Sequence, residues 1–296
     1  MASIIVHGGA GAIDEAQSAP HRLGCQRAAE AGARVLAAGG LALDAVIAAV
    51  RVLEDNPVFN AGTGGALDED GLVLLDAAVM RGADLAYGAV GAVAGVQHPI
   101  DLARAVLDDG RHSILVGPGA IRFARKKGIA LVDPRRLATD PSRAKWWFAT
   151  AERRAESERP TGDTVGAVAR DARGGVAAAT STGGILGKYA GRVGDSPVAG
   201  AGVYARDDLG AISATGHGET ILKTVLGFQA LAALSRAPER PAAQVLTEAL
   251  DDATARAGGR GGLIVALPDG RVAFARNTPH MGVAWIEAGG DVQTAF

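Results

Sequence analysis

The chain has one cysteine, little net charge and few histidines, and each shortage excludes a class of protein. Cys25 is the only cysteine among 296 residues, so no disulfide can form within the chain. Its alanine-rich surroundings indicate a small buried side chain rather than a nucleophile. The formal net charge of −2 gives no electrostatic reason to expect nucleic acid or an anionic membrane as a partner. No two histidines have the spacing of metal ligands, so we expect no cofactor for catalysis.

The sequence also lacks long hydrophobic runs. No window reaches the roughly 18 to 20 uninterrupted apolar residues that span a bilayer. The first residues lack the basic segment and the long apolar stretch of an export signal. With 48% hydrophobic and 21% charged residues, the composition is that of a globular protein with a substantial core. We therefore expect a cytoplasmic protein without a membrane partner.

What is present in the first half is an alternation of short β-rich runs and helical patterns. A β-rich run at 3–6 leads into HGGAG (7–11), which predicts a strand followed by a glycine turn. In the helical stretch predicted at 41–56, Val46, Val50 and Leu53 share one face, which indicates a buried helix. The further elements expected here are helices at 21–38 and 41–56 and strands near 72–80 and 88–96.

The second half is dominated by hairpins. Two helices are expected between them, at 219–235 and 241–257, and the first has the core candidates Leu222, Val225, Leu226 and Leu231. The predicted hairpins pair 164–170 with 175–181, 198–206 with 211–214, and, last in the chain, 263–267 with 271–276.

Both halves thus offer strands together with a pair of helices. Two sheets packed face to face, with a helical layer outside each, would bury the apolar sides of both sets. The prediction is an α+β fold, a four-layer αββα sandwich that residues 1–296 form as a single domain.

One threonine stands where a polar stretch gives way to a strand. Residues 153–160 are the most polar part of the chain and are expected to form an exposed linker. Thr164 opens the strand that follows, which is ordinary because β-branched residues favour strands. If the bond between Asp163 and Thr164 were cut, however, Thr164 would carry a hydroxyl nucleophile and a free α-amine. An α-amine titrates near ~7.7–8.0, so it could accept the hydroxyl proton during attack.

Three polar clusters follow Thr164, and each has an ordinary structural alternative. The predicted hairpin returns TST (180–182) beside Thr164, although a polar strand end is unremarkable. Arg192 and Asp195 stand three positions apart in a glycine-bounded turn, where they could hold the carboxylate and ammonium of an amino acid or form a routine surface ion pair. In TGHGE (215–219), backbone N–H groups could converge on an oxyanion or merely begin a helix.

Together and in this order, these motifs resemble the plant-type asparaginase and isoaspartyl peptidase family of N-terminal-nucleophile hydrolases. The resemblance spans nearly the whole chain, and a set of five or more motifs in order around one nucleophile is specific. The segments that carry it are DTVGAVA (163–169), ATSTGG (179–184), GRVGDSP (191–197), GAG (200–202), TGHGE (215–219), HGGAG (7–11) and LEDNPVFNAG (53–62).

The resemblance implies a precursor that cleaves itself into an α chain of residues 1–163 and a β chain of residues 164–296. It implies an amidohydrolase that releases L-aspartate from L-asparagine and from β-aspartyl (isoaspartyl) dipeptides. By motif, Thr164 is the nucleophile, Thr182 supports its hydroxyl, and Asn60 lies near the nucleophile and helps to order it.

The resemblance also implies how the substrate is held. Arg192 and Asp195 would bind its α-carboxylate and α-amine, and Thr215 and Gly216 would supply the oxyanion hole. The family further implies a dimer of αβ units and a structural sodium ion, held mainly by backbone carbonyls as suits a hard cation. The sodium loop corresponds to 53–63, with Leu53, Glu54, Phe59, Ala61 and Thr63 as the expected ligands.

Asp163 departs from the commonest family pattern. Several asparaginases have glycine before the nucleophile, whereas aspartate is typical of the glycosylasparaginase branch and of many bacterial isoaspartyl peptidases. The Asp163 carboxylate could accept the Thr164 hydroxyl proton while that oxygen attacks the Asp163 carbonyl carbon. One alternative function is therefore cleavage of N-acetylglucosaminyl-asparagine, and another is an uncleaved binding protein without catalysis.

Overall fold

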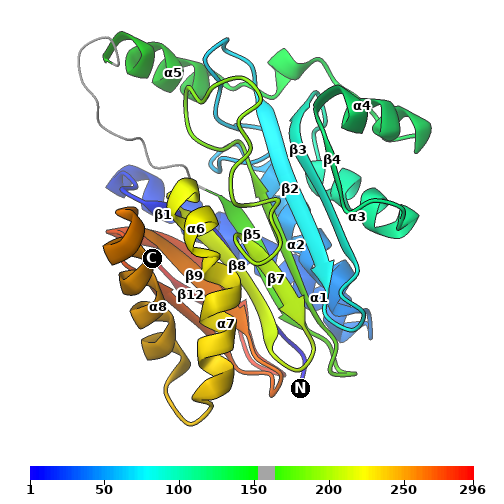
Figure 1. Cartoon of the computed structure of the whole chain (residues 1–296), viewed down its shortest axis with the longest axis vertical. Coiled ribbons are helices and arrows are strands. Elements are labelled where there is room, and N and C mark those ends of the chain that lie inside the picture. Colours follow the sequence, from blue (N-terminus) through cyan, green and yellow to red (C-terminus); the bar gives the residue numbers. More distant parts are fainter. Residues whose placement is uncertain (153–163) are drawn as a thin grey trace.

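The computed structural model describes residues 1–152 and 164–296, which form two stacked sheets with helices on either side (Figure 1). Among these residues the larger sheet has the strand order β12-β11-β1-β5-β6-β2-β3-β4. Its pairs are antiparallel except for β3 with β4. Its strands are β1 (Ser3–Gly11), β2 (Leu74–Arg81), β3 (Tyr87–Ala94), β4 (Ile114–Val116), β5 (Val165–Arg170), β6 (Val176–Thr182), β11 (His280–Ile286) and β12 (Gln293–Ala295).

The smaller sheet has the antiparallel order β10-β9-β8-β7. Its strands are β7 (Val203–Arg206), β8 (Gly210–Gly216), β9 (Gly261–Ala266) and β10 (Val272–Arg276). The helices are α1 (Glu15–Ala37), α2 (Ala42–Asp55), α3 (Pro99–Asp109), α4 (Gly117–Lys126), α5 (Asp140–Glu152), α6 (Gly218–Thr224), α7 (Leu226–Arg236) and α8 (Ala242–Ala257), with a short 3-10 helix η1 (Pro134–Arg136).

Alternating side chains of the central strands divide the interior into layers. In β5, Val165 and Ala167 pack toward α1 and α2, whereas Val168 faces the smaller sheet. In β8, Ala211 faces the larger sheet, whereas Ile212 packs toward α7. This alternation follows from the two-residue period of a strand. The four-layer αββα sandwich predicted from the sequence is therefore confirmed.

The layer between the sheets is built largely from small residues, so the two backbones approach closely. Gly166 shows how closely: a Cβ at this position would lie 2.1 Å from Ser213 Oγ and 2.5 Å from His7 Nε2. Any side chain there would displace one sheet from the other. This space is also where the polar residues described below meet.

The glycine turn predicted at residues 7–11 is wrong, because β1 continues as a strand to Gly11. Beyond His7 the strand still pairs with β11, with a register shift between His7 and Ala10. Gly8 serves close packing, since a Cβ there would lie 2.4 Å from Phe59 Cε1. The glycines of this segment therefore allow β1 to approach Phe59 closely and to pair irregularly with β11.

The single helix predicted at 219–235 is also wrong. It is divided into α6 and α7 at Val225, whose φ of +48° is rare for a β-branched residue. Leu226 and Leu231 are buried as predicted, but Leu222 and Val225 are exposed to 37% and 42%. Two strands, β11 and β12, also follow the hairpin that was expected to be the last. Neither has a strong strand pattern, because β11 contains Gly282 and β12 is very short.

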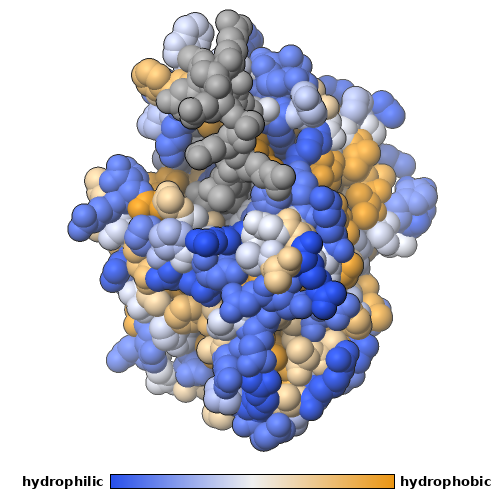
Figure 2. All heavy atoms as spheres, turned by 60° about the vertical axis from the view of Figure 1, so that its left-hand side comes forward, coloured by the Kyte–Doolittle hydropathy of each residue, from blue (hydrophilic) through white to orange (hydrophobic). Residues whose placement is uncertain are grey.

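Several simpler expectations are confirmed. Cys25 is buried, and burial raises the pKa of its thiol to about 12, as expected for an unreactive core residue. Val46, Val50 and Leu53 of α2 are buried. On the face shown in Figure 2, hydrophilic residues surround separate apolar patches. No helix within the described ranges is long and apolar enough to cross a membrane. The predicted linker at 153–160 lies outside the described residues.

Candidate active site

Strand register places the three predicted site threonines on the faces between the sheets. Val165 pairs with Ser181, so Thr164, one residue earlier, lies opposite Thr182 at the end of β6. Thr215 lies on the face of β8 that also carries Ala211 and Ser213. The backbone N–H of Thr164 points to Thr215 Oγ1 at 3.3 Å. Residues 51 positions apart are thus brought together at the end of the inter-sheet layer.

The Thr164 side chain is nearly buried and faces a second hydroxyl. Its Oγ1 lies 3.5 Å from the Oγ of Ser196, which is fully buried. The Ser196 carbonyl accepts a hydrogen bond from Thr180 Oγ1 at 2.7 Å, which ties this turn to β6. Ser196 was part of a recognised motif but was not predicted as a site residue. Its only signal in the sequence was its place directly after Asp195.

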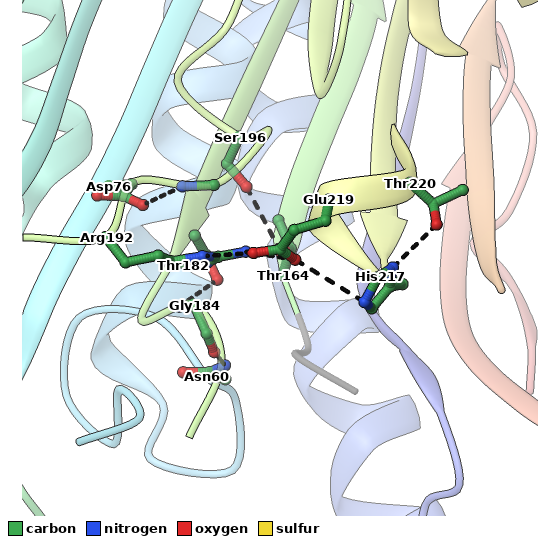
Figure 3. A network of polar contacts seen from close by, with 11 residues as sticks. Asn60, Asp76, Thr164, Thr182, Gly184, Arg192, Ser196, His217, Glu219 and Thr220 are labelled. Atoms are coloured by element: carbon green, nitrogen blue, oxygen red, sulfur yellow. Dashed lines mark hydrogen bonds and ion pairs between the residues drawn. The ribbon is translucent and has the colours of Figure 1, made fainter. Parts of the chain in front are cut away.

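Thr182 and Asn60 meet at the turn that follows β6. The backbone N–H of Gly184 donates to Thr182 Oγ1 at 2.8 Å, and Asn60 Nδ2 donates to the Gly184 carbonyl at 2.8 Å. Asn60 Oδ1 accepts from the N–H of Ala66 at 2.7 Å, so both ends of its amide are held. Figure 3 shows Asn60, Thr182 and Gly184 grouped on one side of Thr164. The predicted neighbourhood of these residues is therefore present.

Arg192 is already engaged by a carboxylate of the protein. Its Nε donates to Glu219 Oε1 at 3.1 Å and its Nη2 donates to Glu219 Oε2 at 3.0 Å (Figure 3). Glu219 was expected only as an acidic residue in the first turn of a helix, a position that it also occupies in α6. Two of the five N–H donors of the guanidinium are used here, so others remain for a second carboxylate.

Asp195 is buried, and Arg192 is a nearby positive charge. Asp195 Oδ2 has no hydrogen-bond partner among the described residues. Burial raises the pKa of this carboxyl to about 7, because the low-dielectric interior disfavours the charged form more than Arg192 stabilises it. A cationic ligand beside Asp195 would reverse that balance. An unpartnered buried carboxylate of this kind is a strong indication of a binding site.

Arg192 and Asp195 border the same small space. A Cβ on Gly218 would lie 2.7 Å from Asp195 Oδ1 and 2.8 Å from Arg192 Nη2. The two opposite charges predicted to hold an amino acid head group therefore converge at the start of α6. Gly218 leaves open a space that any side chain would fill.

The segment after β8 keeps its backbone close to β9. Gly216 has a φ of +130°, and a Cβ there would lie 2.4 Å from the Arg260 carbonyl. Only glycine fits this position. Next in the chain, His217 Nδ1 lies 2.9 Å from Thr220 Oγ1, which directs its ring along α6. The motif is therefore more than a capped helix, because it brings Thr215 to the backbone of Thr164.

His7 lies deep in the same inter-sheet layer. Its Nε2 is 2.7 Å from Ser213 Oγ, and the residue is fully buried. Burial lowers the pKa of its imidazole to about 3, so the ring is neutral at physiological pH. His7 supplies no charge to the site.

In the predicted sodium loop, two backbone carbonyls lie close to Gly62, that of Glu54 within the loop and that of Gln97 outside it. The Glu54 carbonyl accepts from the N–H of Thr63 at 2.8 Å, and the Leu53 carbonyl accepts from Asn56. A Cβ on Gly62 would lie 2.4 Å from the Glu54 carbonyl and 2.8 Å from the Gln97 carbonyl. In the described part of the chain, no group of three or more His, Cys, Asp or Glu side chains could hold a metal. Backbone carbonyl oxygens are ligands that a hard cation prefers.

The Glu54 side chain binds a backbone group outside that loop. It is fully buried, and its Oε1 accepts from the N–H of Ile100 at 3.1 Å. Burial raises the pKa of this carboxyl well above its ordinary value, because the apolar interior disfavours the charged form. Its expected contribution to a sodium site is therefore confined to its backbone carbonyl. The remaining predicted cleavage residue, Asp163, lies outside the described residues.

Comparison with known proteins assigns the chain to a family. The family described as asparaginase matches residues 1–296. The chain is 43% identical to the isoaspartyl peptidase/L-asparaginase of Xenopus laevis over 274 residues, which cover 90% of this chain and 86% of the relative. It is 48% identical to the protein of that name from Bos taurus over 232 residues, which cover 77% and 75%.

A relative with a different name covers more of the chain. The plant-type L-asparaginase of Pyrococcus abyssi is 42% identical over 309 residues, which cover 98% of this chain and 97% of the relative. The family match and these relatives agree with the motifs around Thr164. The chain belongs to the asparaginase family, as the resemblance of its motifs predicted.

Proposed function

We propose that this protein is a self-cleaving amidohydrolase that releases L-aspartate from L-asparagine and from β-aspartyl dipeptides. The observation that carries the proposal is the convergence of Arg192 and Asp195 at Gly218. Figure 3 shows Arg192 on the same side of the site as Thr164 and Thr182. A free amino acid head group carries both complementary charges, whereas an asparagine within a polypeptide carries neither. The names of the relatives support the same pair of substrates.

Cleavage before Thr164 would create the nucleophile. It would convert the Thr164 N–H, now 3.3 Å from Thr215 Oγ1, into an α-amine next to its own hydroxyl. The amine accepts the hydroxyl proton while Oγ1 attacks the side-chain carbonyl carbon of the substrate. The single domain would then consist of two chains, an α chain of residues 1–163 and a β chain of residues 164–296.

The surrounding residues would stabilise the charge that develops. Thr215 and Gly216 supply the environment of the tetrahedral oxyanion, and Thr182 supports the Thr164 hydroxyl. The ammonium formed on Thr164 returns its proton to the departing nitrogen, so ammonia or an amine leaves and an aspartyl ester remains on Oγ1. Water, deprotonated by the same amine, then hydrolyses the ester and releases aspartate. Asn60 holds the turn after β6 in place through Gly184.

Arg192 would bind the substrate without giving up Glu219. Glu219 holds Nε and Nη2, while a Cβ on Gly184 would lie 2.9 Å from Nη1. Nη1 therefore lies close to the turn that follows Thr182. A substrate carboxylate bound there would place the substrate between the guanidinium and Thr164.

We also propose a sodium ion in the loop 53–63 and a dimer of αβ units. The carbonyls around Gly62 support the ion. Thermal unfolding in sodium chloride should occur at a higher temperature than in choline chloride of equal ionic strength, because a ligand at 100 times its Kd adds about 2.7 kcal/mol. Equal melting temperatures would exclude the ion. The dimer is a prediction from the sequence, and light scattering after chromatography tests it. A cytoplasmic location in a bacterial cell is also a prediction from the sequence.

Mass spectrometry and a substrate comparison test the proposed function. The purified protein should yield two chains, 1–163 and 164–296, and should release aspartate from L-asparagine and from β-aspartyl-leucine. An intact chain after prolonged incubation, together with no release of aspartate, would support the uncleaved binding protein instead. Preferential release from N-acetylglucosaminyl-asparagine would support the glycosylasparaginase alternative.

A further inference from the structure

We propose that Asp76 is a positioning residue of the reaction, which fixes the turn carrying Arg192 and Asp195 against the strand carrying Thr182. The inference rests on the proposed function, because it assigns a role in binding the substrate head group. Asp76 belongs to none of the motifs that identified the site. It comes from the α-chain half, whereas the residues that it would position follow Thr164.

The position of Asp76 in the sheet places it beside the proposed catalytic residues. On β2 it lies directly opposite Thr182 of β6. Ala78 and Met80, two and four residues later on the same strand, face the smaller sheet. Asp76 shares that face by the alternation of the strand and is fully buried. A carboxylate in the core of a sheet is costly unless it is bound or has a function.

The two carboxylate oxygens of Asp76 hold two separate backbone segments. Oδ2 accepts from the N–H of Gly194 at 3.2 Å, and Oδ1 accepts from the N–H of Ala92 at 2.8 Å. Gly194 lies between Arg192 and Asp195 in the chain (Figure 3 shows Asp76 beside this turn). The bond to Gly194 therefore fixes the backbone from which both charged side chains project.

Ala92 provides a rigid anchor on the opposite side. Its φ of +49° is rare for a residue with a Cβ, and it lies on β3 near the register shift between Leu75 and Ala77. Asp76 thus connects an irregular part of the sheet to the turn that carries Arg192 and Asp195. Such strained residues persist where the surroundings determine them, and here one carboxylate determines both segments.

Charge links Asp76 to the same turn. Lys188 is nearly buried and its Nζ donates to the Leu74 carbonyl at 2.7 Å. Burial lowers the pKa of this ammonium, whereas the nearby Asp76 opposes that effect. Asp76 and Glu219 both disfavour the charged form of Asp195, and Arg192 favours it. Asp76 therefore acts on Asp195 through its charge as well as through the Gly194 backbone.

Asparagine cannot replace aspartate in this role. Both Gly194 and Ala92 present N–H donors, and the amide nitrogen of asparagine is itself a donor. One of the two backbone groups would therefore lose its partner in a buried site. Asp76→Asn keeps the shape of the side chain but removes one bond and the charge.

The experiment compares Asp76→Asn with Asp84→Asn, a surface carboxylate at the other end of the same hairpin, bound to Arg81. Each fully cleaved variant is assayed with L-asparagine between pH 6 and 9. Asp76→Asn should raise KM about tenfold or more, with kcat changed less than about threefold. It should also move the acidic limb of kcat/KM to lower pH, since one charge that disfavours ionised Asp195 is gone. Asp84→Asn should match the wild-type protein.

A second variant separates positioning from folding. Ala92→Gly adopts a positive φ without strain, so it should recover stability lost in Asp76→Asn. The KM defect should persist in the double variant Asp76→Asn/Ala92→Gly at a wild-type melting temperature. Wild-type KM and an unchanged pH profile in either cleaved Asp76→Asn variant would overturn the proposal. Recovery of both KM and stability in the double variant would also overturn it. An inactive wild-type protein would instead overturn the proposed function.

Discussion

The Arg192 guanidinium is bound at two points by Glu219, and a Cβ on Gly218, the residue before Glu219, would touch both Arg192 and Asp195. The start of α6 therefore holds the proposed substrate clamp in place before any ligand arrives. Preorganisation of this kind reduces the conformational entropy that binding would otherwise cost.

Replacing Arg192 by lysine should weaken substrate binding far more than turnover. Lysine keeps the charge but cannot bind Glu219 and a substrate carboxylate together in one plane. We expect KM for L-asparagine to rise about tenfold or more, with a smaller change in kcat. Steady-state kinetics measure both. Arg206→Lys is the control, because Arg206 binds Asp208 through the same two nitrogens on the surface. Equal effects of the two changes would contradict the assignment.

The affinity for substrate should fall as pH falls through 7. Because the pKa of Asp195 is raised to about 7, its carboxyl becomes protonated below that pH and no longer pairs with the substrate ammonium. KM should therefore rise below pH 7, and Asp195→Asn should give a high KM that no longer varies there. The α-amine of Thr164, near ~7.7–8.0, should limit kcat instead. An unchanged acidic rise of KM in Asp195→Asn would show that another group is responsible.

Thr164→Ala should remain a single chain without activity. The change removes the hydroxyl on which both cleavage and catalysis are proposed to depend. Denaturing electrophoresis and mass spectrometry detect the uncut chain, and the aspartate assay should show no release. Thr247→Ala, on the exposed surface of α8, is the matched control and should be cut and active like the wild-type protein. Two chains from Thr164→Ala would refute the proposed nucleophile.

Glu54→Gln should stabilise the fold at neutral pH. The folded pKa of Glu54 is raised, so the unfolded chain loses its proton first as pH increases and stability declines above the ordinary pKa. Each unit of difference corresponds to about 1.4 kcal/mol. Glutamine keeps the acceptor for the Ile100 N–H. The free energy of unfolding of the variant should therefore exceed that of the wild type at pH 7 and equal it below pH 4. Denaturant unfolding at both pH values measures this, and a variant less stable at pH 7 would contradict it.

Gly166→Ala should separate the two sheets. The added Cβ would lie 2.1 Å from Ser213 Oγ and 2.5 Å from His7 Nε2, and overpacking of this kind typically costs about 1–3 kcal/mol. In Gly119→Ala, in α4, the added Cβ would meet only Arg122 Nη2, at 3.9 Å, so this variant should be neutral or stabilised by up to about 1 kcal/mol. Thermal unfolding compares the two variants. Similar melting temperatures would mean that the sheets can move apart without cost.

The layers could be predicted from the sequence because they depend on local patterns. Alternating and helical spacing identified most strands and the helices α1, α2 and α8, and the order of the motifs grouped Thr182, Arg192 and Asp195 with Thr164. The contacts that complete the site join distant residues. His7 meets Ser213 across 206 positions and Asp76 meets Gly194 across 118, and neither pair leaves a local signal. The division of α6 from α7 was hidden for a related reason, since the apolar pattern continues through the left-handed Val225.

The order of the larger sheet has a consequence for a chain cut before Thr164. Strands β1, β2, β3 and β4 precede the cut and β5, β6, β11 and β12 follow it, yet they alternate in space as β12-β11, β1, β5-β6 and β2-β3-β4. Three ladders, β11 with β1, β1 with β5 and β6 with β2, join the two products. The strands of the two fragments thus interleave in one sheet, so the fragments could separate only if that sheet unfolded. If the bond before Thr164 is cut in the folded protein, these three ladders would still hold the two products in one sheet.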